Sequence, residues 1–457
     1  MLEFYYTLVM LVLFTGMILY SKSIPVALLS LYITYWFLPQ GINISGTNIG
    51  FLSLLGMAEM VYFLYFYLTV LKENNDKNFV HKTIGYVLGI YTFYLLIAFL
   101  STEMPFESQI NDLKYFAYYS FNILIAASCL NKKRDFVCIF RFIVLLIIVS
   151  GIYGVYTYII QFNPFAELVI ATNAIFEEQG MGSHYLAEER GFIHGRISGL
   201  TVHPLLYGGV LVLCFFFLVS YWGEIKNKIE KIFMLFVFLF CILLIVLTGS
   251  RSILIGLLCG LFYYFFKMYP QKVIRYAILG LLLFLAFGLT IEDEYIRSIL
   301  FFWEDHDEIG GSSKSMRLDQ IMAALDIISD DFQSLLFGFG RGWSVQYTSK
   351  YGNVPPFQGF EGLFIFSFVE FGILGTFLYL MAVFAPLNRF NSNYVNDSQK
   401  KTLNMAFLLS GFIIYAFTGH AYGQWLYIVL IFLMIRYSSC LEKEMLHDSE
   451  STYYNKS

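Results

Sequence analysis

The sequence of 457 residues contains few charged residues. Asp, Glu, Lys and Arg make up 14% of it, whereas ordinary soluble domains carry about 25%. Hydrophobic residues account for 58%, and the mean hydropathy is +0.65. Because soluble enzymes, disordered chains and coiled coils all need a larger polar fraction, this composition excludes them and leaves a multi-spanning membrane protein.

Basic charge and metal-binding patterns are also scarce. The net charge is −4, so the chain offers no basic surface to a nucleic acid. Its six cysteines form no C-x-x-C pair and no H-x-x-x-H spacing occurs, so we expect neither a disulfide framework nor a metal site. The apolar run from Leu2 lacks a preceding basic segment and an A-x-A-type cleavage site, so we interpret it as a membrane span rather than a signal peptide.

Long apolar runs are what the sequence has in abundance. A membrane-spanning helix needs about 20 mostly apolar residues. The candidate runs are 3–20, 24–39, 51–71, 83–101, 116–130, 137–162, 205–222, 232–250, 252–268, 277–291, 362–387, 402–418 and 421–437. They predict an all-α, polytopic membrane bundle of about 12–13 transmembrane helices.

The positions of Lys and Arg predict the topology, because short cytoplasmic loops are enriched in both. With alternating spans, 20 of the 29 basic residues fall on one side, which we assign to the cytoplasm together with the C-terminus. The other side holds the remaining nine: Lys114, Arg190, Arg196, Arg251, Arg297, Lys314, Arg317, Arg341 and Lys350. An odd number of spans then places the N-terminus outside.

Two connectors, 163–204 and 292–361, are much longer than the others, and both fall on the extracytoplasmic side. Loops longer than about 15 residues are usually functional or disordered, so we expect the site of action at the outer membrane surface. The two loops divide the chain into N-terminal spans, central spans, C-terminal spans and a cytoplasmic tail, at 1–162, 205–291, 362–437 and 438–457.

The second long loop contains a helical pattern that begins at Arg317. Its apolar residues recur at spacings of three and four, at Leu318, Ile321, Met322, Leu325 and Ile328. This spacing is typical of one apolar face of a helix. The predicted amphipathic helix either lies in the membrane interface and covers the bundle, or packs as a small soluble helix.

Four arginines lie on the side that has few basic residues: Arg196, Arg251, Arg317 and Arg341. Guanidinium groups stay charged and bind phosphate through paired hydrogen bonds, so a set of them suits a lipid diphosphate. Each arginine can instead pair with a nearby acid or a lipid headgroup. Arg251 is the most informative because it lies between two apolar runs, where an arginine is costly and usually functional or paired.

Carboxylates at the outer end of a C-terminal span are candidate acids or bases. Glu361 lies where this span begins, and Glu370 follows nine residues later within it. A partly desolvated carboxyl suits proton transfer, and an intramembrane acid is partnered or functional by default. Glu59 is another intramembrane acid, which we interpret as structural. His203, at the start of a central span, is a further candidate.

Glycines alternate in Gly338-Phe-Gly340-Arg341-Gly342. The segment is not a dinucleotide-binding fingerprint, because no strand precedes it and its third spacing is wrong. We predict a tight turn that brings backbone amides close to another group.

Three motifs occur in a distinctive order. Arg196-Ile-Ser-Gly-Leu-Thr-Val-His203-Pro leads into a span, and Leu-Thr-Gly-Ser-Arg251 separates two spans. A large outer loop with Arg317, Leu-Phe-Gly338-Phe-Gly340 and Glu361 then closes in Glu370-Phe-Gly-Ile-Leu-Gly375. From about residue 190 to residue 380, this order resembles the O-antigen polymerase and O-antigen ligase superfamily, integral-membrane glycosyltransferases of the GT-C type.

The resemblance implies an enzyme of the bacterial cytoplasmic membrane whose active site faces outward. Its donor would be a glycan on undecaprenyl diphosphate, with no nucleotide sugar and usually no metal. The family's essential arginines match Arg196, Arg251 and Arg317. Arg341, His203 and Glu370 are further candidates for substrate binding. Expected partners are the lipid-linked oligosaccharide, the bilayer and a chain-length regulator protein.

One departure from the family pattern favours the polymerase branch, which joins lipid-linked repeat units. Ligases typically carry His-Asn near the end of the large loop, where this sequence reads Pro355-Pro-Phe-Gln358-Gly-Phe-Glu361. Glu361 is then the expected base, acting with Arg251, in a polymerase for O-antigen, capsule or exopolysaccharide. Two alternatives stay open: a ligase-like glycan transferase, and a flippase for lipid-linked oligosaccharides, which predicts broken helices around a central cavity.

Overall fold

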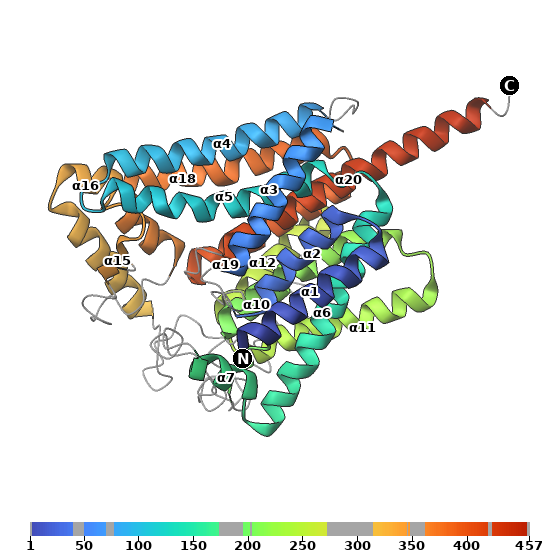
Figure 1. Ribbon diagram of the computed structural model, residues 1–457, viewed down its shortest axis with the longest axis horizontal. Helices are drawn as coiled ribbons and strands as arrows, with labels where there is room; N and C mark the ends of the chain where they lie inside the picture. The colour runs from blue at the N-terminus through green and yellow to red at the C-terminus, as the bar shows by residue number, and fades with distance from the viewer. Residues whose placement is uncertain are drawn as a thin grey trace.

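The computed structural model describes residues 2–39, 50–69, 77–172, 195–201, 203–271, 314–344, 346–347, 362–418 and 423–454. The regular elements in these residues are helices (Figure 1). They are α1 (Leu2–Ser21), α2 (Ile24–Phe37), α3 (Phe51–Thr69), α4 (Lys77–Leu100), α5 (Phe106–Ser128), α6 (Lys133–Ile160), α7 (Pro164–Thr172), α10 (Pro204–Tyr221), α11 (Lys228–Leu247), α12 (Arg251–Met268), α15 (Lys314–Ser329), α16 (Phe332–Phe337), α18 (Leu363–Tyr394), α19 (Ser398–Thr418) and α20 (Gly423–Tyr454). The predicted all-α membrane bundle is confirmed.

Every predicted span except 277–291 contains a helix, and 277–291 lies outside the described residues. Nine of the described helices are long and apolar enough to cross a membrane. The predicted cytoplasmic tail, from residue 438, continues α20 as one helix to Tyr454.

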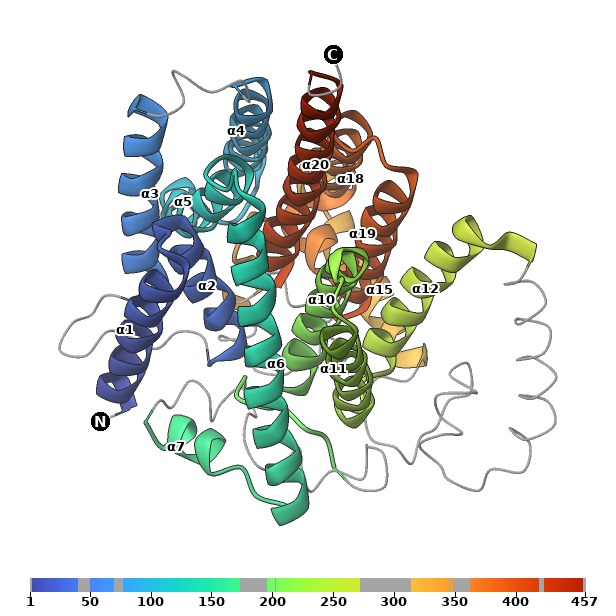
Figure 2. The same ribbon diagram turned by 90° about the vertical axis from the view of Figure 1, so that its right-hand side faces the viewer.

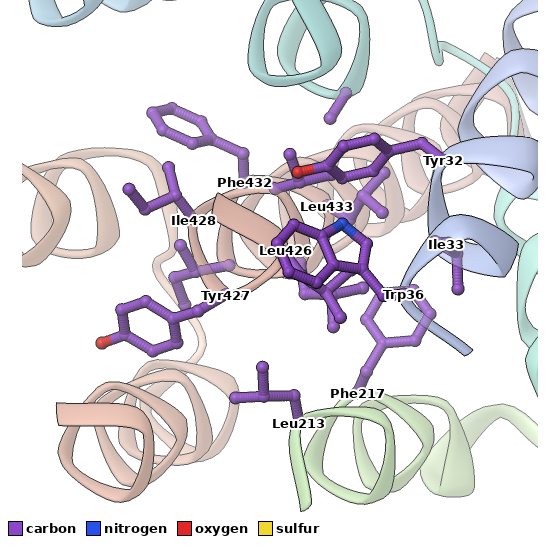
Figure 3. Close-up of a cluster of buried hydrophobic side chains, with 14 of the residues drawn as sticks. Tyr32, Ile33, Trp36, Leu213, Phe217, Leu426, Tyr427, Ile428, Phe432 and Leu433 are labelled. Carbon is purple, nitrogen blue, oxygen red and sulfur yellow. The ribbon is translucent and has the colours of Figure 1, made fainter. Parts of the chain in front are cut away.

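Three helices form the centre of the bundle. The spanning stretch of α20 is 94% buried, against 22% for that of α1, so α20 is enclosed by protein while α1 faces lipid. Figure 3 shows side chains of the central helices meeting: Tyr32, Ile33 and Trp36 of α2, Leu213 and Phe217 of α10, and Leu426, Tyr427, Ile428, Phe432 and Leu433 of α20. Protein on all sides also explains why α2 needs only 14 residues, about 21 Å of helix in a bilayer core of about 30 Å.

Three described segments from connectors predicted to be cytoplasmic, at the end of α1, the start of α6 and the turn after α10, lie together. The Lys133 ammonium lies 2.7 Å from the Glu224 carboxylate, which joins the start of α6 to the end of α10. The Arg134 guanidinium donates to the carbonyl of Ser21 at 3.1 Å, at the end of α1. The start of α1 and the end of α20 lie at opposite ends of the bundle (Figure 2), as an odd number of spans requires.

The predicted amphipathic helix is α15, and with α16 it packs against the first half of α18 (Figure 1). Its packed face carries Gln320, Ala324 and Ile328, all fully buried. Met322, predicted on the apolar face, is 59% exposed and lies outside this contact. Ile321, Leu325 and Ile328 of the predicted face pack in an apolar cluster with α18, so Met322 is the exception.

Candidate functional site

A short non-helical segment, 195–201, lies against the turn between α11 and α12. The amide of Ile197 donates to the carbonyl of Leu247 at 3.0 Å. The Arg196 Nε donates to the carbonyl of Thr248 at 3.0 Å, and only 8% of Arg196 is exposed. Arg196 therefore satisfies a carbonyl at the C-terminal end of α11, where the helix dipole favours a cation.

The same segment is anchored to the C-terminal end of α6. The Asn163 amide donates to the Ser198 hydroxyl at 3.3 Å, and the Tyr153 hydroxyl donates to Asn163 Oδ1 at 2.8 Å. Gly199 has φ +55°, and a Cβ there would lie 2.7 Å from the ring of Tyr207. Only glycine fits both the backbone conformation and this close approach. The backbone of the segment that carries Arg196 is therefore held in one conformation.

Arg251 begins α12 directly after that turn. Ser250 is the N-cap of the helix, and its hydroxyl lies 3.3 Å from the hydroxyl of Ser252. Because Arg196 is bonded to Thr248, three residues before Arg251, the fold brings the two predicted arginines to one turn. Two guanidinium groups, two hydroxyls and a helix N-terminus are groups that attract an anion.

His203 lies on the same connector as Arg196, at the N-cap of α10. Its backbone is held by one side chain, because the Thr201 hydroxyl donates to the His203 carbonyl at 3.0 Å and accepts from its amide at 3.4 Å. The His203 backbone is therefore held at the start of α10, on the connector that carries Arg196.

A second cluster forms where the large loop meets α18. The amide of Phe339 donates to the carbonyl of Val369, and that of Gly340 to the carbonyl of Glu370, both at 3.0 Å. These carbonyls are available because α18 is interrupted at Gly372, whose φ and ψ are 68° and −176°. The predicted tight turn is confirmed, and the group that its amides approach is the broken backbone of α18.

Two glycines make this close contact possible. A Cβ on Gly338 would lie 2.5 Å from the carbonyl carbon of Glu370, and one on Gly372 would lie 2.4 Å from that of Leu336. Both glycines have positive φ, at 71° and 68°. The turn and the helix break therefore fit each other backbone to backbone.

Glu370 and Arg341 belong to this second cluster. Glu370 is fully buried, and one carboxylate oxygen accepts from the Ser344 hydroxyl at 2.6 Å. The Arg341 guanidinium lies 4.5 Å from the centre of the Tyr94 ring. Glu370 is thus a partnered acid, and both side chains help to seat the large loop on α4 and α18.

Gln109 was not singled out by the sequence, yet it is the polar centre of this junction. Its amide nitrogen donates to the Ser101 hydroxyl at 2.6 Å and to the Met104 carbonyl at 3.0 Å, and its oxygen accepts from the Arg341 amide at 3.0 Å. It is 2% exposed. A lone glutamine gives no sequence signal of such a role, since the partners come from distant segments.

The remaining predicted residues lie outside these two clusters or outside the described residues. Glu361, the predicted base, lies outside the described residues. Arg317 lies on α15. Glu59 accepts from the amide of Asn122 at 2.6 Å, which ties α3 to α5. Within the part of the chain that the structure describes, no group of three or more His, Cys, Asp or Glu is arranged to hold a metal ion.

The helical bundle and its arginine-bearing turn define a polytopic integral membrane protein whose paired cations lie at one end of the bundle. A family model described as O-Antigen ligase matches residues 235–380. The matched stretch, about a third of the chain, is similar to this family of glycan transferases. Arg251, Arg317 and Glu370 lie within the matched residues, and Arg196 and His203 precede them. No curated protein gives a significant match to the chain.

Proposed function

We propose that the protein is a polysaccharide polymerase that joins oligosaccharide repeat units carried on undecaprenyl diphosphate, at the outer face of the bacterial cytoplasmic membrane. The observation that carries this proposal is the hydrogen bond from Arg196 Nε to the Thr248 carbonyl, which holds Arg196 at the turn before Arg251. Two arginines brought to one turn supply two guanidinium groups for the two phosphates of a diphosphate. The bias of Lys and Arg toward the opposite end of the bundle supports an outward-facing site.

The reaction exchanges one glycosidic bond for another. The hydroxyl of the incoming repeat unit attacks the anomeric carbon of the growing glycan, and the bond from that carbon to the diphosphate oxygen breaks. Undecaprenyl diphosphate leaves with the electron pair of that bond. Glu361 accepts the proton of the attacking hydroxyl, a role proposed from its position in the family's motif order. Diphosphate is a good leaving group, so positioning and a modest base suffice.

Arg196 and Arg251 stabilise the charge that develops on the departing diphosphate. Groups fixed before the reaction are effective because they need not reorganise as the charge forms. The bond from Arg196 to Thr248 and the position of Arg251 as the first residue of α12 bring both residues to the same short stretch of backbone. The hydroxyls of Ser250 and Ser252 add donors for phosphate oxygens beside the N-terminus of α12.

Complementation of a deletion strain tests the proposal. The gene is deleted and restored as wild type, Arg251→Ala, Glu361→Gln or Arg389→Ala, and the extracted glycan is run on a gel for ladder length. Arg389 is an exposed arginine near the opposite end of α18 and serves as the matched control. The proposal predicts single repeat units in the deletion strain and in Arg251→Ala at normal protein level, and full ladders in Arg389→Ala.

A ligase is the second candidate, because the matching family model is described as O-Antigen ligase. The same gel separates the two functions. Long chains that persist on undecaprenyl and never reach the acceptor in the deletion strain would identify a ligase. Single lipid-linked units that accumulate on the cytoplasmic side would identify a flippase and contradict the proposed mechanism.

A further inference from the structure

A basic cavity lies at the end of the bundle opposite to the arginine-bearing turn. It has a volume of about 510 Å³ and is lined by Tyr20, Lys133, Arg134, Val137, Cys138 and Arg141. Tyr20 comes from the end of α1, and the other residues come from the first turns of α6. The proposed transferase reaction does not use this cavity.

The spacing of the basic residues along α6 explains why they line one cavity. Arg134, Cys138 and Arg141 recur at intervals of four and three residues, so they share one face of the helix. Arg134 is tied to α1 through the Ser21 carbonyl at 3.1 Å, and Arg141 through the Tyr20 hydroxyl at 3.3 Å. Both arginines therefore contact α1 while their side chains stay accessible from outside the bundle.

Three carboxylates, Glu224, Glu230 and Asp135, approach the same region and offset only part of its positive charge. Glu224 lies 2.7 Å from Lys133, and Glu230 lies 3.8 Å from one end of the Arg141 guanidinium. The side chain of Arg141 remains 58% exposed. Asp135, in the first turn of α6, is electrostatically coupled to Lys132 and Arg134. Four cations, Lys132, Lys133, Arg134 and Arg141, thus lie near three carboxylates, and the helix dipole at the N-terminus of α6 adds positive potential. The cavity is electrostatically suited to a phosphate.

The helices that contribute residues to the cavity or its carboxylates, α1, α6 and α11, also carry exposed apolar side chains. Leu19 is 73% exposed, Leu145 52%, Ile229 76% and Ile232 61%. In a membrane-spanning bundle such side chains contact acyl chains. A ligand that carries a phosphate beside two hydrocarbon chains fits this combination of a basic cavity and exposed apolar side chains on the same helices.

We propose that this cavity binds the headgroup of an anionic phospholipid, with its phosphate between Arg134 and Arg141 and its acyl chains along α1 and α11. Basic pockets between transmembrane helices on the cytoplasmic side are suited to such headgroups. The bound lipid bridges α1 and α6 and so fixes the N-terminal helices against the rest of the bundle. The site is independent of the proposed transferase reaction.

Native mass spectrometry of the full chain in neutral detergent tests this site with phosphatidylglycerol and phosphatidylcholine as probes. Wild type is expected to retain phosphatidylglycerol in preference to phosphatidylcholine. Arg134→Gln with Arg141→Gln is expected to weaken phosphatidylglycerol binding about 25-fold, about five-fold per arginine. Arg389→Gln, which removes an exposed arginine outside the cavity, is the control and should bind as wild type does.

Glu230→Gln separates binding from folding, because it removes a competing carboxylate and should tighten phosphatidylglycerol binding a few-fold. A merely structural role of these arginines predicts no such gain. Equal retention of the two lipids by wild type would overturn the proposal. Competition by millimolar inorganic phosphate as effective as that by phosphatidylglycerol would also overturn it, since the site would then bind free phosphate rather than a lipid.

Discussion

Arg196 illustrates how one hydrogen bond can serve both the fold and the proposed chemistry. Its Nε donates to the carbonyl of Thr248, which needs a partner because it lies at the end of α11. The same bond fixes the direction of the guanidinium at the turn that precedes Arg251. We therefore infer that this position requires the planar guanidinium group and not only its positive charge.

Arg196→Lys tests this requirement. Lysine keeps the charge but lacks the planar group that bonds the carbonyl and binds phosphate through two atoms. We expect glycan polymerisation to fall about 100-fold at unchanged protein level, as for loss of one fixed donor to a developing negative charge. Initial rates of ladder growth measure the effect, with Arg389→Lys as the control. A rate within a factor of two to three of wild type would mean that charge is sufficient.

Gly338 and Gly372 predict a second residue-scale effect. Alanine at either position places a Cβ within 2.5 Å of a backbone atom, at a residue with positive φ. We expect each substitution to cost on the order of 3 kcal/mol in stability, from strain and overpacking together. Thermal unfolding in detergent measures it. Gly89→Ala on α4 is the control, because a Cβ there meets nothing within 4 Å and should leave the melting temperature unchanged or slightly higher.

At the scale of single elements, the large loop is fastened to the bundle by α16 and the turn that follows it. The turn accepts and donates backbone bonds on two sides, to α18 and to the connector between α4 and α5. Phe339 shows this arrangement, since its amide donates to Val369 and its carbonyl accepts from the Met104 amide at 2.8 Å. These polar bonds act together with a buried apolar cluster that joins the loop to the same two elements: Met104, Ala324, Ile328, Phe339, Trp343, Ile365 and Val369.

Gln109→Leu tests this junction. It removes the partner of the Arg341 amide and of the Met104 carbonyl, and each buried group left unsatisfied costs about 1–3 kcal/mol. We expect the amides of residues 332–344 to exchange hydrogen for deuterium at least about ten-fold faster, since a tenfold change corresponds to about 1.4 kcal/mol. Hydrogen exchange with mass spectrometry measures this. Gln399→Leu, at an exposed glutamine of α19, should leave these amides unchanged.

The apolar runs predicted where the helices lie, because each span must satisfy its own backbone hydrogen bonds in lipid. They did not predict where the helices begin or break. α5 begins at Phe106, ten residues before the predicted span, since its first turns are polar and pack against the large loop. The interruption of α18 at Gly372 is set by contact with residues from another segment.

The sequence predicted which residue types form the candidate site, but not which of these residues lie close together. The sequence singled out Arg196 and Arg251 as outer arginines, but only the fold shows that residues 195–201 lie on the turn between α11 and α12. The partners of Glu370 likewise come from the large loop, through Ser344. The role of Glu361 stays a prediction, since the residue lies outside the described ones.

At the scale of the whole molecule, the two ends of the bundle differ in charge and in proposed task. The end with the basic connectors contacts the cytoplasm in our topology, and the end with Arg196 and Arg251 faces outward. In this arrangement, lipid-linked substrates bind at the outer membrane surface, and the proposed phospholipid site at the cytoplasmic surface anchors the protein in the bilayer.

Cysteine labelling tests the assignment of sides. Phe162→Cys, after α6, should react with a membrane-impermeant maleimide in intact cells, and Lys226→Cys, between α10 and α11, should react only after permeabilisation. Both positions are exposed. Five of the six native cysteines are buried, so Cys259→Ser lowers the background. The reverse pattern would place the arginine-bearing turn in the cytoplasm and contradict the proposed function.

Release of undecaprenyl diphosphate from purified protein in liposomes, supplied with a lipid-linked repeat unit, is the most direct test of the central claim. We predict that wild type forms a ladder of longer glycans and releases one undecaprenyl diphosphate for each new glycosidic bond. Arg251→Ala and Arg196→Ala should lose both products in parallel, while Arg389→Ala keeps them. Wild-type release rates in both variants, or a ladder that forms without released undecaprenyl diphosphate, would contradict the account.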